Sequence, residues 1–164
     1  MEGLNGPPPP KPPVRLAPPP AVLFACGQNA VRSPIAAGLF AQMFGRAVYV
    51  GSAGVRKGEL DPFAIAVMEE IGIDISRHKP VTFEELEEWE GLSFDLIVTL
   101  APEAHHRALE LTRTSAVDVE YWPTPDPTIF EGSRTQRLNS YRALRDQLSA
   151  HIRERFAGPG TGNE

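Results

Sequence analysis

The segment Val22-Leu23-Phe24-Ala25 is a short run without a polar side chain, and it ends directly before Cys26. Such a run is typical of a β-strand that is covered on both faces. Further strand patterns follow, each separated from the last by a segment with apolar residues at helical spacing. Strands are expected at 22–25, 47–50, 94–100 and 117–121, and helices at 34–44, at 62–71, from 82 onward, at 102–113 and at 138–152. This alternation predicts a parallel sheet with right-handed crossovers and helices on both faces.

The two ends of the chain differ in composition from this alternating part. Nine prolines fall between Pro7 and Pro20, which disfavours helix and sheet and favours an extended, solvated arm. We therefore expect residues 1–20 to be a disordered proline-rich leader, 21–157 to be one folded domain and 158–164 to be a flexible tail. The leader also contains a PxxPxR pattern from Pro10 to Arg15, although a plain linker explains such a run more simply.

Charge and hydropathy argue against several classes of protein. The 164 residues carry 16 Lys and Arg against 21 Asp and Glu, so the broad basic surface of a nucleic-acid-binding protein is not expected. No apolar run has the length of a membrane span, and the N-terminus lacks the pattern of a signal peptide, so we expect a cytoplasmic protein without a membrane partner. The single cysteine can form no disulfide within the chain, so Cys26 is either a buried apolar residue or a reactive thiol.

The residues that follow Cys26 favour the second of these roles. The first strand leads into a tight loop, Cys26-Gly27-Gln28-Asn29-Ala30-Val31-Arg32-Ser33, which continues directly into a helix. Backbone N–H groups of such a loop converge on its centre, and the helix N-terminus adds roughly half a positive charge. The same field stabilises a thiolate, the nucleophilic form of cysteine. Because the guanidinium of Arg32 can bind two oxygens of one phosphate group, the loop is predicted to bind phosphate, with Cys26 as nucleophile.

Displacement of a phosphate ester also requires an acid opposite the nucleophile, which protonates the leaving oxygen. Asp126 is the candidate, because Pro125 and Pro127 restrict the loop that carries it. Ligands bind beyond the carboxyl ends of parallel strands, and both Cys26 and Asp126 follow predicted strands. The same carboxylate could then activate water as a base. We expect no metal and no other cofactor, since loop, arginine and acid supply what a metal would.

Some of these features, taken singly, have simpler explanations. A lone cysteine after an apolar strand is usually part of the core, and the C-x5-R spacing alone recurs by chance. The strand-to-helix context and the proline-flanked aspartate favour catalysis over those explanations. Tyr121 and Trp122 are expected to pack rather than to contact substrate, and His105 and His106 to lie on a solvated helix face.

With these residues in place, the sequence resembles the low-molecular-weight protein tyrosine phosphatase family, which also contains a branch of arsenate reductases. The resemblance covers residues 21–157. It rests on Val22-Leu23-Phe24, Cys26, Asn29, Arg32-Ser33-Pro34, Ser52-Ala53-Gly54, Gly72-Ile73-Asp74, Ser76, His78, Phe94-Asp95 and Asp126-Pro127. It implies a fold of the phosphotyrosine protein phosphatase I type, an α/β fold with a four-stranded parallel sheet in the order 2-1-3-4 and helices on both faces.

The resemblance also implies roles for individual residues. The implied catalytic roles are nucleophile for Cys26, phosphate clamp for Arg32, acid and base for Asp126, and a hydroxyl that supports the thiolate for Ser33. A supporting hydrogen-bond network that holds the loop is implied for Asn29, Ser52 and His78.

The sequence departs from the family's pattern at several positions. Gln28 and Ala37 replace a glycine and a glutamate that are common in the family, and neither touches the chemistry directly. Thr128 and Ile129 stand where phosphotyrosine-directed members often carry aromatic residues, so the preferred substrate need not be phosphotyrosine. Val31 occupies the place of a second loop cysteine, so no loop disulfide can protect Cys26 from oxidation.

The sequence therefore predicts a cysteine-dependent phosphomonoester hydrolase of the protein tyrosine phosphatase type. Its substrate would be a phosphorylated protein or a small aryl phosphate, and its intermediate a phosphocysteine. An arsenate reductase is the alternative, because arsenate mimics phosphate; with one cysteine, reduction would need an external thiol such as glutathione. A second alternative is a phosphate-binding module without turnover, against which the intact Cys26, Arg32 and Asp126 count. Substrate choice is expected to depend on Gly27, Gln28, residues 56–60 and residues 128–130.

Overall fold

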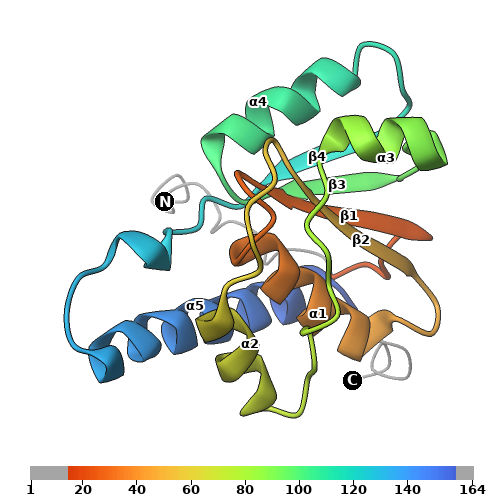
Figure 1. Cartoon of the computed structure of the whole chain (residues 1–164). Coiled ribbons are helices and arrows are strands. Elements are labelled where there is room, and N and C mark those ends of the chain that lie inside the picture. Colours follow the sequence, from red (N-terminus) through yellow and green to blue (C-terminus); the bar gives the residue numbers. More distant parts are fainter. Residues whose placement is uncertain (1–14, 158–164) are drawn as a thin grey trace, which may run out of the picture.

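A computed structural model describes residues 15–157, and these residues form the α/β fold that the sequence predicts (Figure 1). The described elements are, in chain order, β1 (Ala21–Cys26), α1 (Arg32–Phe44), β2 (Tyr49–Gly54), α2 (Pro62–Glu69), α3 (Phe83–Glu90), β3 (Leu96–Thr99), α4 (Pro102–Leu111), β4 (Asp118–Tyr121), the 3-10 helix η2 (Pro127–Ile129) and α5 (Arg134–Arg155). The strands pair in parallel in the order β2-β1-β3-β4, which confirms the expected order 2-1-3-4. Within this part of the chain, no helix is long and apolar enough to cross a lipid bilayer.

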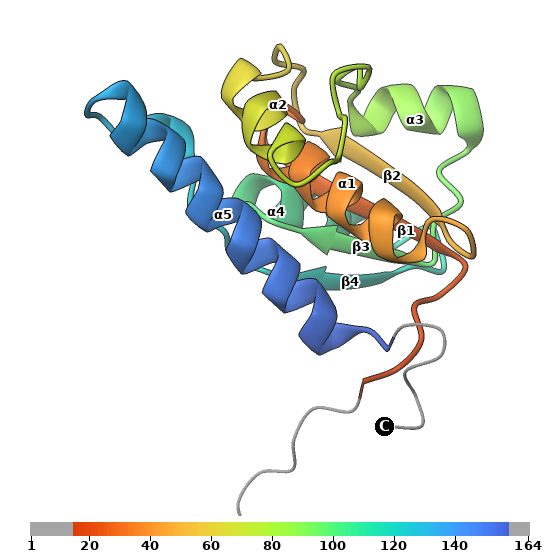
Figure 2. The same ribbon diagram turned by 90° about the horizontal axis from the view of Figure 1, so that it is seen from below.

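Helices cover both faces of the sheet. In Figure 1, α3 and α4 lie above the strands and α1 and α5 below them, and Figure 2 shows α1 and α5 crossing the strands from that second side. Side chains of consecutive β1 residues point to opposite faces of the sheet. Phe24 packs with side chains of α1 and α5, whereas Leu23 packs with side chains of α3 and α4. Both side chains are fully buried, so the apolar run at 22–25 is a central strand, as expected.

Several element boundaries differ from the sequence prediction. The second strand runs from Tyr49 to Gly54 rather than over 47–50, because Ser52, Ala53 and Gly54 pair with the end of β1 although they carry no strand-forming side chains. The first helix begins at Arg32, two residues before the expected start at Pro34. The last helix begins at Arg134, where Ser133 and Gln136 form a capping box that the apolar spacing does not reveal.

The ends of the described region contact each other. Arg15 donates a hydrogen bond from Nη2 to the carbonyl oxygen of Phe156 (3.1 Å), and the N–H of Ala157 donates to the carbonyl oxygen of Leu16 (2.9 Å). The expected leader therefore already contacts the domain at residues 15 and 16, because this pairing satisfies backbone groups beyond the end of α5. The other parts of the predicted ends, residues 1–14 and 158–164, lie outside the described residues.

Candidate active site

The carboxyl ends of β1 and β2 meet at one edge of the sheet, where Cys26 pairs with Gly54. The loop 27–31 leads from there into α1, as the sequence predicts. Gly54 allows a close approach, since a Cβ at this position would lie 2.8 Å from the backbone nitrogen of Asn29. The end of β2 thus packs directly against the loop.

The backbone of the segment after β2 holds the loop in place. Four loop carbonyl oxygens accept hydrogen bonds from its N–H groups: Cys26 from Val55 (3.2 Å), Gly27 from Arg56 (2.8 Å), Gln28 from Gly58 (2.9 Å) and Ala30 from Asp61 (3.1 Å). A trans peptide places its C=O and N–H on opposite sides, so the N–H groups that follow these carbonyls point away from that segment. Together with the start of α1 they provide the donors that an anion requires.

Asn29 is the centre of a buried hydrogen-bond network. Its Oδ1 accepts from the backbone N–H of Val81 (2.9 Å), which fixes the orientation of the amide because a backbone N–H can only donate. Its Nδ2 therefore donates to the hydroxyls of Ser33 (2.8 Å) and Ser52 (2.9 Å). Asn29 is fully buried and has a φ of 56°, a left-handed conformation that asparagine tolerates better than most residues.

His78 completes the network from a distant segment. Its Nε2 lies 3.0 Å from Oδ1 of Asn29, and this oxygen can only accept, so Nε2 carries the proton. Burial lowers the pKa of His78, and the hydrogen bond with Asn29 opposes that effect. Hydrogen bonds thus join Asn29 to Ser52 and His78, the residues for which the family resemblance implies a network, and Asn29 also bonds to Ser33.

Ser33 orients its hydroxyl toward the thiol. Sγ of Cys26 lies 3.0 Å from Oγ of Ser33, and both residues are buried. This oxygen also accepts a hydrogen bond from Nδ2 of Asn29. The hydroxyl of Ser33 therefore stands within hydrogen-bond distance of Sγ and can donate its own proton to the sulfur.

Arg32 and Asp126 approach each other in the cavity that Cys26 also lines. Arg32 donates from Nη1 to the carbonyl oxygen of Thr124 (3.0 Å), and its Nη2 lies 4.0 Å from Oδ2 of Asp126. The other carboxylate oxygen, Oδ1, accepts from both the N–H (2.9 Å) and the hydroxyl (2.7 Å) of Thr128. Thr128 thus holds one oxygen of Asp126 and leaves Oδ2 directed at the guanidinium.

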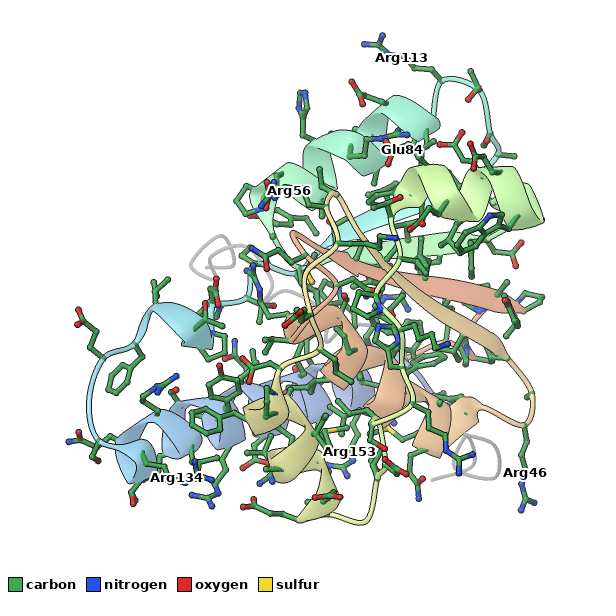
Figure 3. All side chains as sticks on the ribbon, in the orientation of Figure 1. Arg46, Arg56, Glu84, Arg113, Arg134 and Arg153 are labelled. Carbon is green, nitrogen blue, oxygen red and sulfur yellow. The ribbon has the colours of Figure 1, made fainter. Side chains whose placement is uncertain are left out.

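A charged pair forms another part of the rim. Arg56, which follows β2, makes two hydrogen bonds to Glu103 at the start of α4 (2.7 and 2.9 Å), and Figure 3 shows Arg56 beside that helix. Arg56 holds the pKa of Glu103 below its ordinary value, and the charge of Arg32 acts in the same direction. A Cβ on Gly27 would overlap with the Glu103 carboxylate, so the pair lies directly over the loop.

These side chains line one open cavity of about 330 Å³. The cavity brings together the predicted Cys26, Arg32 and Asp126, whereas Asn29, Ser33, Ser52 and His78 lie behind the loop as its support. Four carboxylates and two guanidinium groups line the cavity: Glu59, Asp61, Glu103, Asp126, Arg32 and Arg56. Because the acidic groups are in excess, the rim disfavours a ligand that carries negative charge there.

Sequence reasoning missed three features of this region. Glu103 lies just past β3, so the same rule on strand ends that found Asp126 could have found it. Asp61, directly before the helix expected at 62–71, also lines the cavity, and its Oδ2 accepts a 2.6 Å hydrogen bond from the hydroxyl of Tyr141. The prediction that His105 is merely solvated is wrong, because its Nδ1 lies 3.0 Å from the Thr99 hydroxyl and its ring stacks on Tyr121.

A parallel α/β sheet whose first strand ends in a Cys-x5-Arg phosphate-binding loop, with an aspartate facing the arginine, defines a class of small α/β proteins that bind phosphate or its analogues. The sequence profile of one such family, described as low molecular weight phosphotyrosine protein phosphatase, matches residues 21–157. The chain belongs to this family.

Several curated relatives are named for arsenate reduction. The arsenate reductase of Bacillus subtilis is 31% identical over 139 residues, which are 85% of this chain and 96% of that protein. Arsenate reductase 1 of Staphylococcus epidermidis is 33% identical over 136 residues, 83% of this chain and 94% of that protein. The glutaredoxin arsenate reductase of Synechocystis sp. is 29% identical over 136 residues, 83% of this chain and 95% of that protein.

Solved structures with this fold carry both activities in their descriptions. A low molecular weight protein tyrosine phosphatase from T. tengcongensis has a TM-score of 0.66 and 27% identity, covering 82% of this chain and 95% of its own. The YwlE arginine phosphatase of Geobacillus stearothermophilus has a TM-score of 0.66 and 26% identity, covering 83% and 90%. A structure described as an arsenate reductase in the phosphate binding state has a TM-score of 0.61 and 27% identity, covering 80% and 92%.

Proposed function

We propose that this chain is a cysteine-dependent phosphomonoester hydrolase in which Cys26 is the nucleophile, Arg32 the phosphate clamp and Asp126 the acid and base. The observation that carries the proposal is that Cys26 and Arg32, at the two ends of the loop, and Asp126, from a distant segment, line one cavity. Membership in the family supports it. The presence of a single cysteine also supports it, because hydrolysis needs only one thiol.

In the first step, the Cys26 thiolate attacks phosphorus and forms a P–S bond while the P–O bond to the leaving group breaks. The leaving oxygen takes its proton from the Asp126 carboxyl group, which faces the clamp from the far side of the cavity. Arg32 and the loop N–H groups hold the three equatorial oxygens, where negative charge accumulates in the transition state.

In the second step, water attacks the phosphocysteine and gives its proton to the Asp126 carboxylate. The P–S bond breaks, inorganic phosphate is released and the sulfur leaves as a thiolate. The Ser33 hydroxyl, held 3.0 Å from Sγ, stabilises that leaving charge. The chain returns to its starting state without a reductant or a metal.

The excess of acidic side chains on the rim bears on the leaving group. Glu59 and Asp61 line the cavity in addition to the Arg32–Asp126 and Arg56–Glu103 pairs. A positively charged leaving group would be attracted there. The guanidinium released when the P–N bond of phosphoarginine breaks has this property, and the description of one similar structure names an arginine phosphatase. We therefore propose to compare phosphoarginine with phosphotyrosine peptides as substrates.

The proposal is tested with p-nitrophenyl phosphate at mildly acidic pH in the presence of EDTA. Cys26→Ser should abolish turnover of this substrate, and Asp126→Asn should reduce kcat about 100-fold or more for an alkyl phosphate, whose leaving oxygen needs a proton. Asp118→Asn is the matched control, because Asp118 is an exposed carboxylate at the other end of β4. Phosphate tightly bound by a chain without turnover would refute hydrolysis and support the phosphate-binding module.

Arsenate reduction is the second candidate, favoured by the names of the curated relatives. In that reaction the Cys26 thiolate would attack arsenic(V) with loss of water. An external thiol would then attack Sγ, giving a mixed disulfide and releasing arsenite, and a second external thiol would reduce the disulfide. Both added thiols must come from outside, since the chain has one cysteine, and the name of the Synechocystis relative points to glutaredoxin.

The two candidates are separated by one comparison. The protein is incubated with arsenate and either glutathione alone or glutathione with glutaredoxin, and arsenite is measured beside p-nitrophenyl phosphate hydrolysis. Hydrolysis without arsenite formation supports the phosphatase. Arsenite formation that depends on Cys26, without aryl phosphate hydrolysis, would replace it by the reductase.

A further inference from the structure

A second cavity adjoins the candidate active site. It is a groove of about 560 Å³ between η2 and α5, the two elements drawn in cyan and blue in Figure 1. The apolar side chains that line it are Pro125, Pro127, Ile129, Phe130, Ala143 and Leu144. We refer to it as the η2–α5 groove.

Two large apolar side chains flank this groove in contact with solvent. Ile129 is 77% exposed and Phe130 is 48% exposed, although only Pro127 and Thr128 separate them in sequence from Asp126. Single exposed apolar residues are common, but two adjacent ones beside an apolar groove form the kind of surface that binds a ligand. Neither position is required for the chemistry proposed above.

The η2–α5 groove and the active-site cavity share a wall. Asp126 lines both of them, and its Oδ2 lies 4.0 Å from the guanidinium that would hold the phosphate. Consecutive residues of an extended peptide advance about 3.3–3.6 Å each, so the residues on either side of a bound phosphoresidue must cross the rim of the cavity. On the Asp126 side, that rim leads into the groove.

On the side of α4, the rim of the active-site cavity is charged rather than apolar. The Arg56–Glu103 pair joins the segment after β2 to the start of α4, and α4 packs on the opposite sheet face from α5. Figure 3 shows Arg56 beside α4 and Arg134 at the start of α5, well apart. A substrate therefore meets a charged wall on the α4 side and an apolar groove on the α5 side, and the groove's ionisable side chains, Asp126 and Glu131, are both acidic.

We propose that the η2–α5 groove binds an uncharged apolar side chain of a phosphoprotein substrate, one or two residues from the phosphorylated position. The proposal rests on the hydrolase function proposed above and specifies its substrate as a protein segment with an apolar residue next to the phosphoresidue. The apolar lining selects such a side chain, and the acidic groups disfavour an aspartate or glutamate at the same position. Arsenate and small aryl phosphates are too small to reach the groove.

The test uses phosphopeptides in an alanine background, carrying whichever phosphoresidue the protein hydrolyses. Leucine is placed in turn at the two positions before and the two after it, and kcat/KM is divided by that of the all-alanine peptide. We expect one position to give a ratio of about 5 to 20, the value for partial burial of one leucine side chain. A glutamate at that position should give a ratio below 1.

Two matched variants test whether the η2–α5 groove causes the preference for leucine. Ala143→Asp places a carboxylate in the groove, and Ala150→Asp makes the same exposed change seven residues further along α5, outside the groove. The leucine ratio should fall to about 1 in Ala143→Asp and remain in Ala150→Asp. Ile129→Ala, a change at an exposed wall that should not affect folding, is expected to reduce the ratio about 2- to 3-fold.

The outcomes separate this proposal from the one on which it rests. Absence of hydrolysis of every phosphopeptide and of p-nitrophenyl phosphate would refute the hydrolase function itself. Hydrolysis with leucine ratios near 1 at all four positions would refute only the groove proposal. A leucine preference that survives Ala143→Asp, or a dimer that this variant dissociates, would also refute it, since another surface or a second copy of the chain would then be responsible.

Discussion

The buried amide of Asn29 should contribute more to stability than its position in a loop suggests. Asn29→Ala removes the hydrogen bonds to Ser33, Ser52 and the N–H of Val81, as well as the contact with His78. It also forces a φ of 56° on a residue that disfavours it. The variant leaves the helices and strands intact, so any loss is local in origin.

The magnitude follows from these contacts. Three hydrogen bonds between buried partners contribute roughly 1 kcal/mol each, and a left-handed conformation costs alanine roughly 1 kcal/mol more. The His78 contact adds little, because that side chain can turn to solvent. We therefore expect the free energy of unfolding to fall by about 4 kcal/mol, out of the ~5–15 kcal/mol of a typical domain.

The assay is urea unfolding followed by tryptophan fluorescence, since Trp122 is 4% exposed in the fold and stacks on His151. Asn29→Gly is the informative control, because it loses the same hydrogen bonds without the strained φ and should be about 1 kcal/mol more stable than Asn29→Ala. Asn139→Ala, at an exposed position of α5, should change stability by less than about 0.5 kcal/mol.

The reasoning would be refuted by a loss below about 1.5 kcal/mol in Asn29→Ala with an unchanged dependence on urea concentration. That result would mean that water replaces the amide at no cost. Equal stability of the alanine and glycine variants would show that the left-handed backbone carries no strain. In either case the network would not be what holds the phosphate loop.

Three further predictions address the acid, the core and the pH dependence. Thr128→Val removes a hydroxyl that holds Asp126, so kcat should fall about 5-fold for an alkyl phosphate. It should fall little for p-nitrophenyl phosphate, because the leaving oxygen of that substrate needs no proton. Equal losses would mean that Thr128 does not act through Asp126. Leu148→Ala, at a 1% exposed position of α5, should lower the free energy of unfolding by about 3 kcal/mol in urea, and a loss under 1 kcal/mol would contradict the observed packing. Burial lowers the pKa of His78, so the unfolded chain binds more protons and the free energy of unfolding should decline as the pH falls through 6.5. His78→Gln should reduce the slope of this decline by at most ~1.4 kcal/mol per pH unit. An unchanged slope would assign the decline to other groups.

Much of the site could be predicted because its signals are local. Cys26, the loop and Arg32 fall within seven consecutive residues, and a strand followed by such a loop and a helix has few possible geometries. The central strand was equally clear, since a run buried on both faces must be wholly apolar. The second strand was misplaced because Ser52-Ala53-Gly54 becomes a strand through pairing with β1, which no local propensity records.

The contacts that complete the site join distant segments. His78 reaches Asn29 across 49 residues, and Arg56 reaches Glu103 across 47. The family resemblance implied the first pair, whereas nothing in the sequence pointed to the second. The role of Thr128 as a holder of Asp126 was likewise invisible, because a threonine after Asp-Pro has many possible partners until the loop takes up its fold.

By itself, the sequence determined the parallel sheet, the thiol and guanidinium over the loop, and the limitation to one cysteine, because periodicity, short spacing and composition act within a few residues. Only the tertiary structure decided which side chains meet at the end of β1. It brought the Ser33 hydroxyl to 3.0 Å from the Cys26 sulfur, set Asp126 against Arg32, and opened an apolar groove between η2 and α5. Those arrangements depend on where the crossovers place segments that are far apart in the chain, and that placement is fixed by the packing of the core as a whole.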